Sequence, residues 1–475
     1  MHTQLAVLGG GPGGYAAAFL AADEGMEVTL VEVDKRLGGT CLLRGCIPSK
    51  ALLHVARVIG EVDELTAAWG VQYDAPAIDV DTMRARKEKV ISTLCGGLKQ
   101  LAKRRKVRVI HAKGVFENST TLRLEGDAPT LGADAQLTFD RCILATGSVP
   151  AMPSAFATDS PRVMDSTGAL ELRDIPKQLL VIGGGYIGLE MGTVYAQLGS
   201  KVSVVELMDG LLPGVDRDLV KPLHRRLTKL FADRIYLDTK VGSIGVRDNS
   251  VEVAFEGPGK FGVERFDRVL VSVGRRPNSQ NVGLENTQVE IDSRGFVLCD
   301  KQQRTADPSI FAVGDVAGNP MLAHKATHEA KTAVEALRGK PAEFDKLAIP
   351  AVVFTDPEIA WAGWSEEDAK KHGQTFEKAV YPWGASGRAQ ALGRVEGLTK
   401  WLIDPDSNRV LGCGIVGPGA GELIAEAVLA IEMGCEVRDI TESVHPHPTL
   451  SETLMNAGEV FFGTATELYK PKRQR

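Results

Sequence analysis

Two cysteines lie five residues apart in a glycine-flanked stretch, residues 38–50, which reads GGTCLLRGCIPSK. In an ideal α-helix the Cα atoms of Cys41 and Cys46 would stand about 8–9 Å apart, whereas a disulfide tolerates at most roughly 7 Å. A bridge would therefore distort the start of a helix, which Gly45 makes easier. A strained and accessible bridge is suited to thiol exchange, and a helix N-terminus lowers the pKa of a thiol.

A second polar cluster surrounds His447. This residue stands between Pro446 and Pro448, so its backbone is held in a rigid, extended turn. Glu452 follows five residues later, where its carboxylate could orient and stabilise a charged imidazole. A single histidine is more often a solvent-facing loop residue. Because histidine titrates near neutral pH, the cluster nevertheless predicts a general base that exchanges a proton with a thiol.

The first element that must position these groups is a strand–helix–strand unit. Residues 5–8 predict a buried strand, 9–14 (GGGPGG) a glycine-rich turn, 15–23 a helix, and 27–31 a strand that ends at Glu32. Gly9 permits the tight turn, Gly11 the approach of a pyrophosphate, and Gly14 the packing of helix on strand. The helix N-terminus supplies N–H donors for phosphates, and Glu32 can accept from ribose hydroxyls.

The same unit recurs 174 residues later without a gap. Strand 179–182 enters the turn 183–188 (GGGYIG), and after a helix the strand 202–205 ends at Glu206. The three glycine positions are repeated at Gly183, Gly185 and Gly188. Each acid stands 23 residues after the first glycine of its unit. Two units in register, each ending in an acid, predict two nucleotide sites.

The acid of the second unit favours NAD over NADP. A carboxylate beside the ribose repels a 2′-phosphate, and NADP sites recruit arginine instead. After Glu206 the chain reads Leu-Met-Asp-Gly-Leu-Leu, and no cation occurs until Arg217.

Three apolar strands end in small or acidic residues that suit a dinucleotide. Strand 142–148 ends in Thr146-Gly147-Ser148, strand 269–274 ends in Gly274, and strand 310–315 ends in Asp315. With two nucleotide sites, the cysteine pair is interpreted as a redox-active pair beside a flavin. A structural disulfide would close too short a loop to stabilise much, and a metal site would need two further soft ligands that are not adjacent.

Composition sets limits on partners and location. The 475 residues suggest about three domains, and 44% hydrophobic with 24% charged residues is typical of a globular protein. A net charge of −6 argues against a nucleic-acid binder, and the basic run 84–108 is interpreted as the solvated face of a helix. No run of 18 apolar residues and no signal peptide are found. We therefore expect a cytoplasmic protein with no nucleic-acid or membrane partner.

Taken together, these motifs resemble those of the class I flavin-dependent pyridine nucleotide–disulfide oxidoreductases, from Gly9 to about Gly463. The most specific motifs are 38–50, ATGS at 145–148, GRRPN at 274–278, GD at 314–315, and HPT…E at 447–452. The segment 321–326 (MLAHKA) resembles the family's flavin-contacting loop. Leu43-Arg44 departs from the family pattern, in which Asn follows the leucine, so the redox potential of the pair is not carried over.

The resemblance implies an α/β fold with two Rossmann-like dinucleotide-binding domains, for FAD and NAD, and an α+β C-terminal dimerisation domain. The expected limits are 1–148 for the first part of the FAD domain, 149–274 for the NAD domain, 275–345 for the second, central part of the FAD domain, and 346–475 for the interface domain. The segment 354–358 (FTDPE) resembles part of that interface domain.

The resemblance also implies which residues hold the two cofactors. FAD would be held by Gly9, Gly11, Gly14, Glu32, Thr40, Lys50, Gly114, Thr146, Gly147, Ser148, Asp315, Met321, Leu322, Ala323 and His324. NAD would be held by Gly183, Gly185, Gly188, Glu190, Glu206, Val241 and Gly274. No metal is expected.

The catalytic roles follow from the same resemblance. Cys41 would be the interchange thiol, and Cys46 the charge-transfer thiolate that faces the flavin. Lys50 and Glu190 would form an ion pair near the flavin N5 edge. His447, with Glu452 behind it, would come from the other subunit of an obligatory homodimer.

The implied reaction is the oxidation of protein-bound dihydrolipoamide to lipoamide, with reduction of NAD⁺ to NADH, within a 2-oxo acid dehydrogenase or glycine cleavage complex. Two alternatives remain open. Another disulfide reductase, such as glutathione reductase, would carry NADP-selecting arginines after Glu206. A non-catalytic redox sensor would bind FAD without turnover of dihydrolipoamide.

Overall fold

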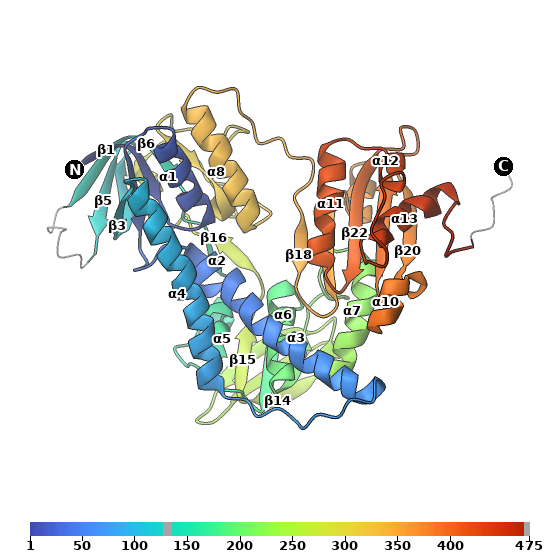
Figure 1. Ribbon diagram of the computed structural model, residues 1–475. Helices are drawn as coiled ribbons and strands as arrows, with labels where there is room; N and C mark the ends of the chain where they lie inside the picture. Colours follow the sequence, from blue (N-terminus) through green and yellow to red (C-terminus); the bar gives the residue numbers. More distant parts are fainter. Residues whose placement is uncertain (127–134, 470–475) are drawn as a thin grey trace.

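Three main sheets organise the computed structural model, which describes residues 1–126 and 135–469 (Figure 1). The segment 470–475, at the end of the predicted interface domain, lies outside the described residues. Two of the sheets are built around parallel strands, and the third is antiparallel. The predicted fold class is confirmed: the chain is α/β with two Rossmann-like units and a C-terminal α+β domain.

The first sheet forms around β1 (His2–Leu8), whose residues 5–8 are buried as their apolar side chains require. The strand order is β3-β2-β1-β6-β5-β4, and β17 pairs with β6. The other strands are β2 (Val28–Glu32), β3 (Arg108–His111), β4 (Lys113–Asn118), β5 (Thr121–Glu125), β6 (Gln136–Leu144) and β17 (Ile310–Ala312). Helices α1 (Pro12–Asp23) and α8 (Ala323–Leu337) pack against each other beside this sheet (Figure 1).

Helix α1 begins earlier than the expected Tyr15. Its first residue is Pro12, whose fixed φ suits the first position of a helix and whose missing N–H has no intrahelical partner to lose. The helix N-terminus therefore lies directly at the end of the glycine turn.

The second sheet repeats this arrangement with the order β11-β10-β9-β15-β8, all parallel. Its elements are β8 (Val163–Met164), β9 (Gln178–Ile182), α6 (Tyr186–Gln197), β10 (Lys201–Val205), β11 (Ile235–Tyr236) and β15 (Arg268–Val271). A three-stranded antiparallel sheet adjoins it, formed by β12 (Lys240–Val246), β13 (Val251–Glu256) and β14 (Gly262–Phe266).

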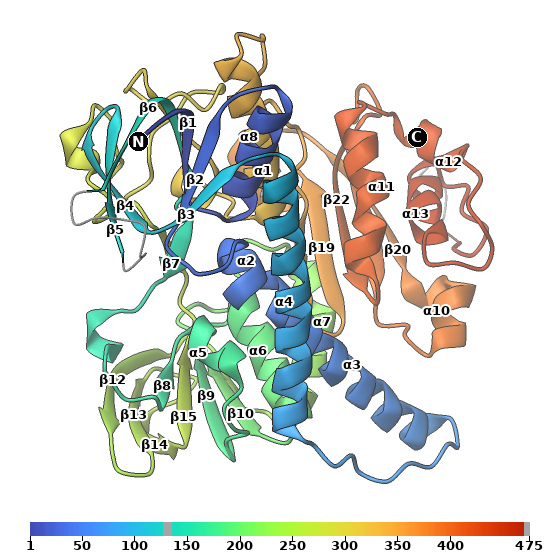
Figure 2. The same ribbon diagram turned by 60° about the vertical axis from the view of Figure 1, so that its left-hand side comes forward.

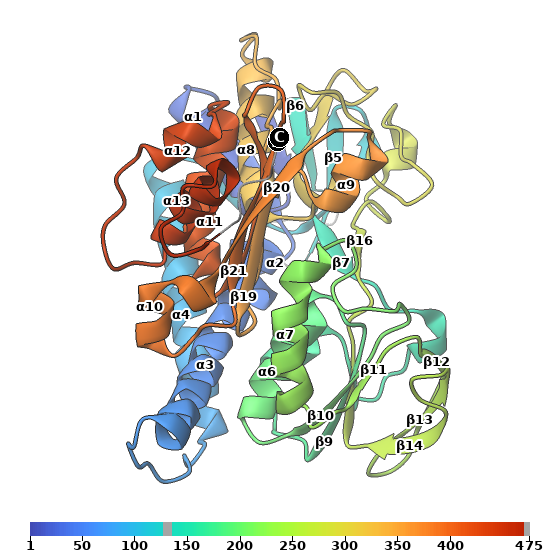
Figure 3. The same cartoon turned by 90° about the vertical axis from the view of Figure 1, so that its right-hand side faces the viewer.

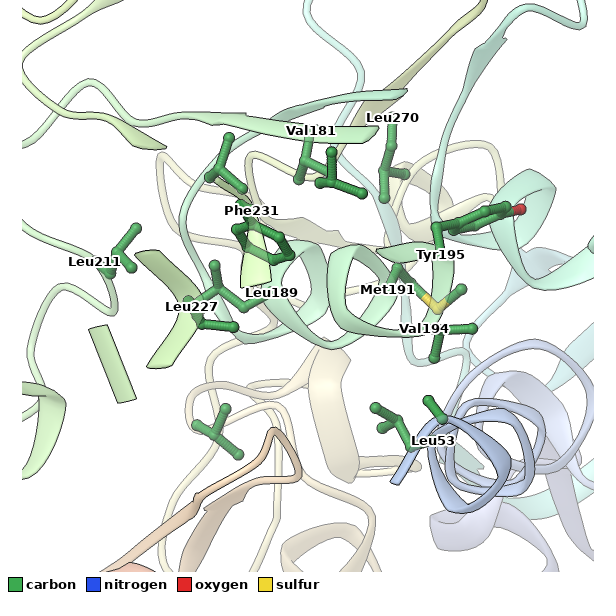
Figure 4. Packing of buried hydrophobic residues seen from close by; sticks show 14 of the residues in the cluster. Leu53, Val181, Leu189, Met191, Val194, Tyr195, Leu211, Leu227, Phe231 and Leu270 are labelled. Atoms are coloured by element: carbon green, nitrogen blue, oxygen red, sulfur yellow. The ribbon is translucent and has the colours of Figure 1, made fainter. Parts of the chain in front are cut away.

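The core of this second unit forms on both sides of α6. Figure 4 shows Leu189 of α6 near Phe231 on one side, and Val194 near Leu53 on the other. Leu53 belongs to α3 (Cys46–Ala68), so the helix that begins at Cys46 packs directly onto the second nucleotide unit. Figure 2 shows α3 running down from this point, beside the long basic helix α4 (Val80–Arg104).

The third sheet has the antiparallel order β18-β19-β22-β21-β20. Its strands are β18 (Ala351–Val353), β19 (Glu358–Gly363), β20 (Glu377–Pro382), β21 (Leu398–Ile403) and β22 (Val410–Gly417). Three helices lie beside this sheet (Figure 3): α11 (Ala420–Glu432), α12 (Val437–Thr441) and α13 (Glu452–Phe462).

The chain connects the first two units twice, and the two connecting segments pair with each other in one short antiparallel ladder. Strand β7 (Ser148–Pro150) leaves the first unit, and β16 (Arg275–Pro277) returns to it as its antiparallel partner. This ladder lies at two of the expected domain limits. We keep the limits 1–148, 149–274, 275–345 and 346–475 as a proposal. In the part of the chain that the structure describes, none of the helices combines the length and apolarity needed to cross a bilayer.

A buried cation joins the second unit to the third sheet. Lys400 of β21 is 1% exposed, and its Nζ lies 2.8 Å from Asp216, 2.6 Å from Asp218 and 2.7 Å from Glu366. Asp218 belongs to α7 (Arg217–Leu230), which lies beside the third sheet (Figure 3). Although burial raises the pKa of Glu366, hydrogen bonds from Lys378 and Lys400 hold it at about 2.

Replacing Lys400 by methionine should lower the free energy of unfolding by about 3–5 kcal/mol, because buried carboxylates then lose their counter-ion. The matched variant Lys378→Met removes a half-exposed partner of Glu366 and should cost less than about 1 kcal/mol. Since the folded-state pKa of Glu366 is depressed, its contribution is present above about pH 4.5 and is lost as the pH falls towards about 2. Denaturant melts of both variants at several pH values measure this difference, and equal losses would contradict it.

Candidate active site

The two cysteines lie on opposite sides of a break between two helices. Helix α2 (Gly39–Arg44) ends at Gly45 and α3 begins at Cys46, with Gly45 at φ −146° and ψ −113°. A side chain at Gly45 would press on the carbonyl oxygen of Thr40, so glycine is required here. Because the helix is broken between the two cysteines, their Cα atoms are not held at the separation of an ideal α-helix, which would keep the sulfurs apart. Both cysteines are present as free thiols.

The two thiols have opposite acidities. The hydrogen bond from Cys41 lowers the pKa of Cys46 to about 7, against the effect of burial and with help from the charge of Lys50. The same hydrogen bond, together with burial, raises the pKa of Cys41. Cys46 is therefore the sulfur that carries the negative charge of the reduced pair.

Beside the cysteines opens a cavity of about 1160 Å³, which exceeds the range of about 300–1,000 Å³ usual for small-ligand pockets. Among the residues predicted to hold FAD or to react, those lining it are Gly9, Gly11, Glu32, Thr40, Cys41, Cys46, Lys50, Gly114, Thr146, Gly147, Ser148, Glu190, Asp315, Met321 and Ala323. Residues from seven separate segments thus converge on one space large enough for a dinucleotide.

Three predicted FAD residues lie outside this lining. Gly14 packs beneath the first turn, where a side chain would collide with the carbonyl oxygen of Gly9. The His324 ring is exposed, and its Nε2 lies 2.8 Å from the carbonyl oxygen of Pro350. Leu322 precedes α8 as its N-cap residue. Their roles toward FAD stay predictions.

The two glycine turns have the same geometry. Gly9 and Gly183 have φ of 109° and 107°, in the region that favours glycine. The Glu32 carboxylate accepts the N–H of Gly10 at 2.6 Å, and the Glu206 carboxylate accepts that of Gly184, also at 2.6 Å. The acids at the ends of β2 and β10 therefore hold the two turns in the same way.

Both helices that follow these turns have N-termini without a side-chain cap. The N-cap residues are Gly11 for α1 and Gly185 for α6, and neither helix has an acidic residue in its first turn. No protein atom lies within 4 Å of a Cβ built on Gly185. The fold itself leaves room for a side chain at Gly185, and the N-terminus of α6 beside it has no side-chain cap. This arrangement fits a pyrophosphate, which would use the space and accept from the N–H groups of the helix.

Of the remaining predicted NAD residues in the second unit, Gly188, Val241 and Gly274 do not line the large cavity, whereas Glu190 does. Gly188 lies against the carbonyl oxygen of Gly183, and Gly274 has φ 125° just after β15. Val241 is buried in β12, with 7% exposed. Glu190 reaches the flavin side, where both its oxygens lie 3.0–3.1 Å from Lys50 Nζ.

Arg217, the first cation after Glu206, is already engaged. Its guanidinium donates to the carbonyl oxygens of Leu211 at 2.8 Å and Leu212 at 2.6 Å, and its Nε donates to Val215 at 2.9 Å. With these bonds made, Arg217 is held by the backbone of its own loop. This arrangement supports NAD over NADP.

Sequence reasoning assigned no role to Arg275. Its Nε donates to the Ser148 hydroxyl at 2.8 Å, and that hydroxyl donates to Asp315 at 2.5 Å. All three residues line the cavity. The signal was present in the motif at 274–278, but only the β7–β16 ladder shows what this arginine contacts.

His447 does not line the cavity that holds the cysteines of its own chain. Its side chain is 77% exposed, and its Nδ1 lies 2.9 Å from Glu452 Oε1. The other Glu452 oxygen accepts the N–H of Thr449 at 2.7 Å, so the carboxylate is fixed behind the imidazole. His445, by contrast, is buried against Glu426 at 2.8 Å, as suits a structural residue.

A family model described as pyridine nucleotide-disulphide oxidoreductase matches residues 3–330, and the dimerisation domain of that family matches residues 349–457. The chain belongs to the pyridine nucleotide-disulphide oxidoreductase family. It is therefore an oxidoreductase that uses FAD and NAD, as predicted. The presence of a dimerisation domain supports a homodimer.

Its relatives within this oxidoreductase family include two dihydrolipoyl dehydrogenases. That of Vibrio cholerae is 46% identical, with 100% of this chain and 99% of that protein covered, and that of Bacillus subtilis is 41% identical, with 99% and 98% covered. Among solved structures, LpdA from Mycobacterium tuberculosis has a TM-score of 0.88 at 25% identity. The HOCl-induced flavoprotein disulfide reductase RclA from Escherichia coli has a TM-score of 0.86 at 27% identity. Each comparison covers 97% of this chain and 99% of the other.

Replacing Gly185 by alanine should raise the KM for NAD⁺ about tenfold, because the new methyl group takes the space left for the pyrophosphate. The variant should keep its flavin and its thermal midpoint, since no protein atom opposes the methyl group. Gly384→Ala, at another glycine with open space around it, is the matched control. Steady-state kinetics with varied NAD⁺ measure the effect, and an unchanged KM in Gly185→Ala would show that the pyrophosphate lies elsewhere.

Proposed function

We propose that this oxidoreductase oxidises protein-bound dihydrolipoamide to lipoamide and reduces NAD⁺ to NADH, through Cys41, Cys46 and FAD. The full-length similarity to dihydrolipoyl dehydrogenases, at 46% identity for Vibrio cholerae, supports the substrate. The observation that carries the chemistry is the thiol pair at the helix break, with an acidic Cys46 beside the large cavity. A pair of this kind exchanges a disulfide at one sulfur while the other faces the cofactor.

The protein's own groups account for the thiol steps. Starting from the Cys41–Cys46 disulfide, a dihydrolipoyl thiol gives its proton to His447 and attacks the Cys41 sulfur, so that Cys46 leaves as a thiolate. The second dihydrolipoyl thiol then attacks the lipoyl sulfur of this mixed disulfide, so that the lipoyl disulfide forms and Cys41 leaves, and the proton of the second thiol passes to Cys41. Bound FAD supplies the route by which the two electrons of the reduced pair reach NAD⁺ as a hydride. Lys50, held by Glu190, stabilises the Cys46 thiolate.

The base for this exchange is proposed to come from a second copy of the chain. The exposed His447 lies beside Glu452 at the start of α13, and it does not line the cavity of its own chain. A two-fold dimer formed through the dimerisation domain would present each His447 to the other subunit's Cys41. The substrate partner is proposed to be a lipoyl-carrying domain of a 2-oxo acid dehydrogenase or glycine cleavage complex in the cytoplasm.

The alternative of an NADP-dependent disulfide reductase has less support. Arg217 is bound to three backbone carbonyls of its own loop, and Glu206 would repel a 2′-phosphate at the predicted ribose position. A redox sensor without turnover would retain FAD but show no dihydrolipoamide-dependent NADH formation. An absorbance assay at the NADH wavelength separates these alternatives directly.

The variants Cys41→Ser and Cys46→Ser should each lose turnover at least about a thousandfold, yet differ in their spectra. Reduced Cys41→Ser should keep the long-wavelength charge-transfer band, because the Cys46 thiolate remains beside the flavin. Cys46→Ser should lack it. Cys299→Ser, a partly buried cysteine elsewhere, is the control and should behave as the parent. A band that persists in Cys46→Ser would refute the assignment of the two sulfurs.

Mixed dimers test whether His447 acts across the subunits. Cys41→Ser and His447→Gln should each be inactive as homodimers. When the two chains are refolded or expressed together, one site of each mixed dimer combines an intact cysteine pair with an intact histidine. Activity should then recover to about a quarter of the parent value for random pairing. No recovery, despite mixed dimers shown by mass spectrometry, would place His447 and the cysteines in one chain.

A further inference from the structure

A residue of the third domain, Phe354, contacts both members of the Lys50–Glu190 ion pair. Phe354 lies in the connection between β18 and β19, and its backbone N–H donates to Glu190 Oε1 at 3.0 Å. Its ring faces the Lys50 ammonium, with Nζ 4.3 Å from the ring centroid. One residue therefore holds both members of the pair, the anion through its main chain and the cation through its side chain.

Charged contacts fix the segment that carries Phe354. Asp356 accepts from Arg226 of α7 at 2.6 Å and also pairs with Arg394. Glu358 accepts the N–H of Gly421 at 2.9 Å, near the start of α11. These contacts tie the β18–β19 connection to the second nucleotide unit and to the third domain.

A glycine keeps α11 close to the aromatic ring. A Cβ built on Gly421 would lie 3.6 Å from a ring carbon of Phe354. The ring is thus confined between the first turn of α11 on one side and the Lys50 ammonium on the other. Its place depends on the packing of the dimerisation domain, which family comparison matches to residues 349–457.

We propose that Phe354 is a positioning residue, through which the dimerisation domain sets the place of the Lys50 ammonium beside Cys46. This inference rests on the proposed function of Cys46 as the flavin-facing thiolate. An ammonium over an aromatic face is attracted to the ring quadrupole without being neutralised, so it keeps its full charge toward the sulfur. Glu190, which accepts the Phe354 N–H, also holds the ammonium through its two carboxylate oxygens.

Four helices contribute the titratable groups around Cys46. Cys41 comes from α2, Lys50 from α3, Glu190 and Tyr186 from α6, and Tyr15 from α1. Only Lys50 among these bears a positive charge. If the ring that holds it is removed, the ammonium gains freedom to leave the sulfur, and the thiolate loses stabilisation.

The test is a pH titration of the Cys46 thiolate in Phe354→Leu and Phe354→Tyr. Leucine removes the aromatic face but keeps the backbone N–H to Glu190, whereas tyrosine keeps both. The flavin-loaded variants are reduced with dithiothreitol without oxygen, and the charge-transfer absorbance is followed against pH. Phe354→Leu should raise the midpoint by about half a pH unit, and Phe354→Tyr should return it to the parent value.

A second readout does not depend on the flavin signal. The rate of alkylation of Cys46 by iodoacetamide, followed by mass spectrometry of the cysteine peptides, should show the same shift in its pH midpoint. A midpoint in Phe354→Leu that is unchanged or lower, in a protein with normal flavin content and thermal midpoint, would overturn the role of Phe354. Absence of the charge-transfer band in the parent protein would instead overturn the proposed function itself.

Discussion

The chemistry depends on keeping one sulfur charged inside a partly buried site. A thiolate taken out of water is costly unless a positive charge stands near it. Here that charge is Lys50, one helical turn after Cys46, and the Glu190 carboxylate holds it in place. The hydrogen bond between the two sulfurs gives Cys41 and Cys46 their opposite pKa directions, and the charge of Lys50 favours the thiolate at Cys46. Distinct roles for the two sulfurs therefore come from their surroundings, since the residues are chemically identical.

The helix break at Gly45 makes this arrangement possible. A continuous helix would have kept the sulfurs apart, and a flexible loop would not have held Lys50 at a fixed distance from Cys46. By ending α2 and beginning α3 within one residue, the chain brings the sulfurs together and starts a new helix under Cys46. Lys50, near the start of the 23-residue helix α3, then reaches Glu190 of the second nucleotide unit.

The duplicated nucleotide unit gives the two predicted cofactor sites similar backbone geometry. In each copy the acid at the end of the second strand accepts an N–H from the glycine turn, and the helix N-terminus is left without a side-chain cap. The copies differ in what surrounds them. The first opens on the large cavity with the cysteines, while the second has Arg217 folded back onto its own loop.

Local sequence patterns were sufficient to predict much of the structure of this molecule. The glycine spacings, the acids that follow them and the cysteine pair are close in sequence, so their geometry is set by nearby backbone and could be predicted. Sequence by itself thus determined the two nucleotide units, the position of the cysteine pair and the family resemblance. The start of α1 at Pro12 was placed three residues late, because proline at a first helical position resembles part of the glycine turn.

Tertiary structure alone decided which distant groups meet. The Phe354–Glu190 and Arg275–Ser148 contacts join residues more than 120 positions apart, and no local signal specifies such partners. The same holds for His447, whose sequence neighbours suggest a base but whose exposed position shows that the cavity of its own chain does not receive it. Contacts of this kind are set by how whole sheets and helices pack, which depends on the burial of many apolar side chains at once.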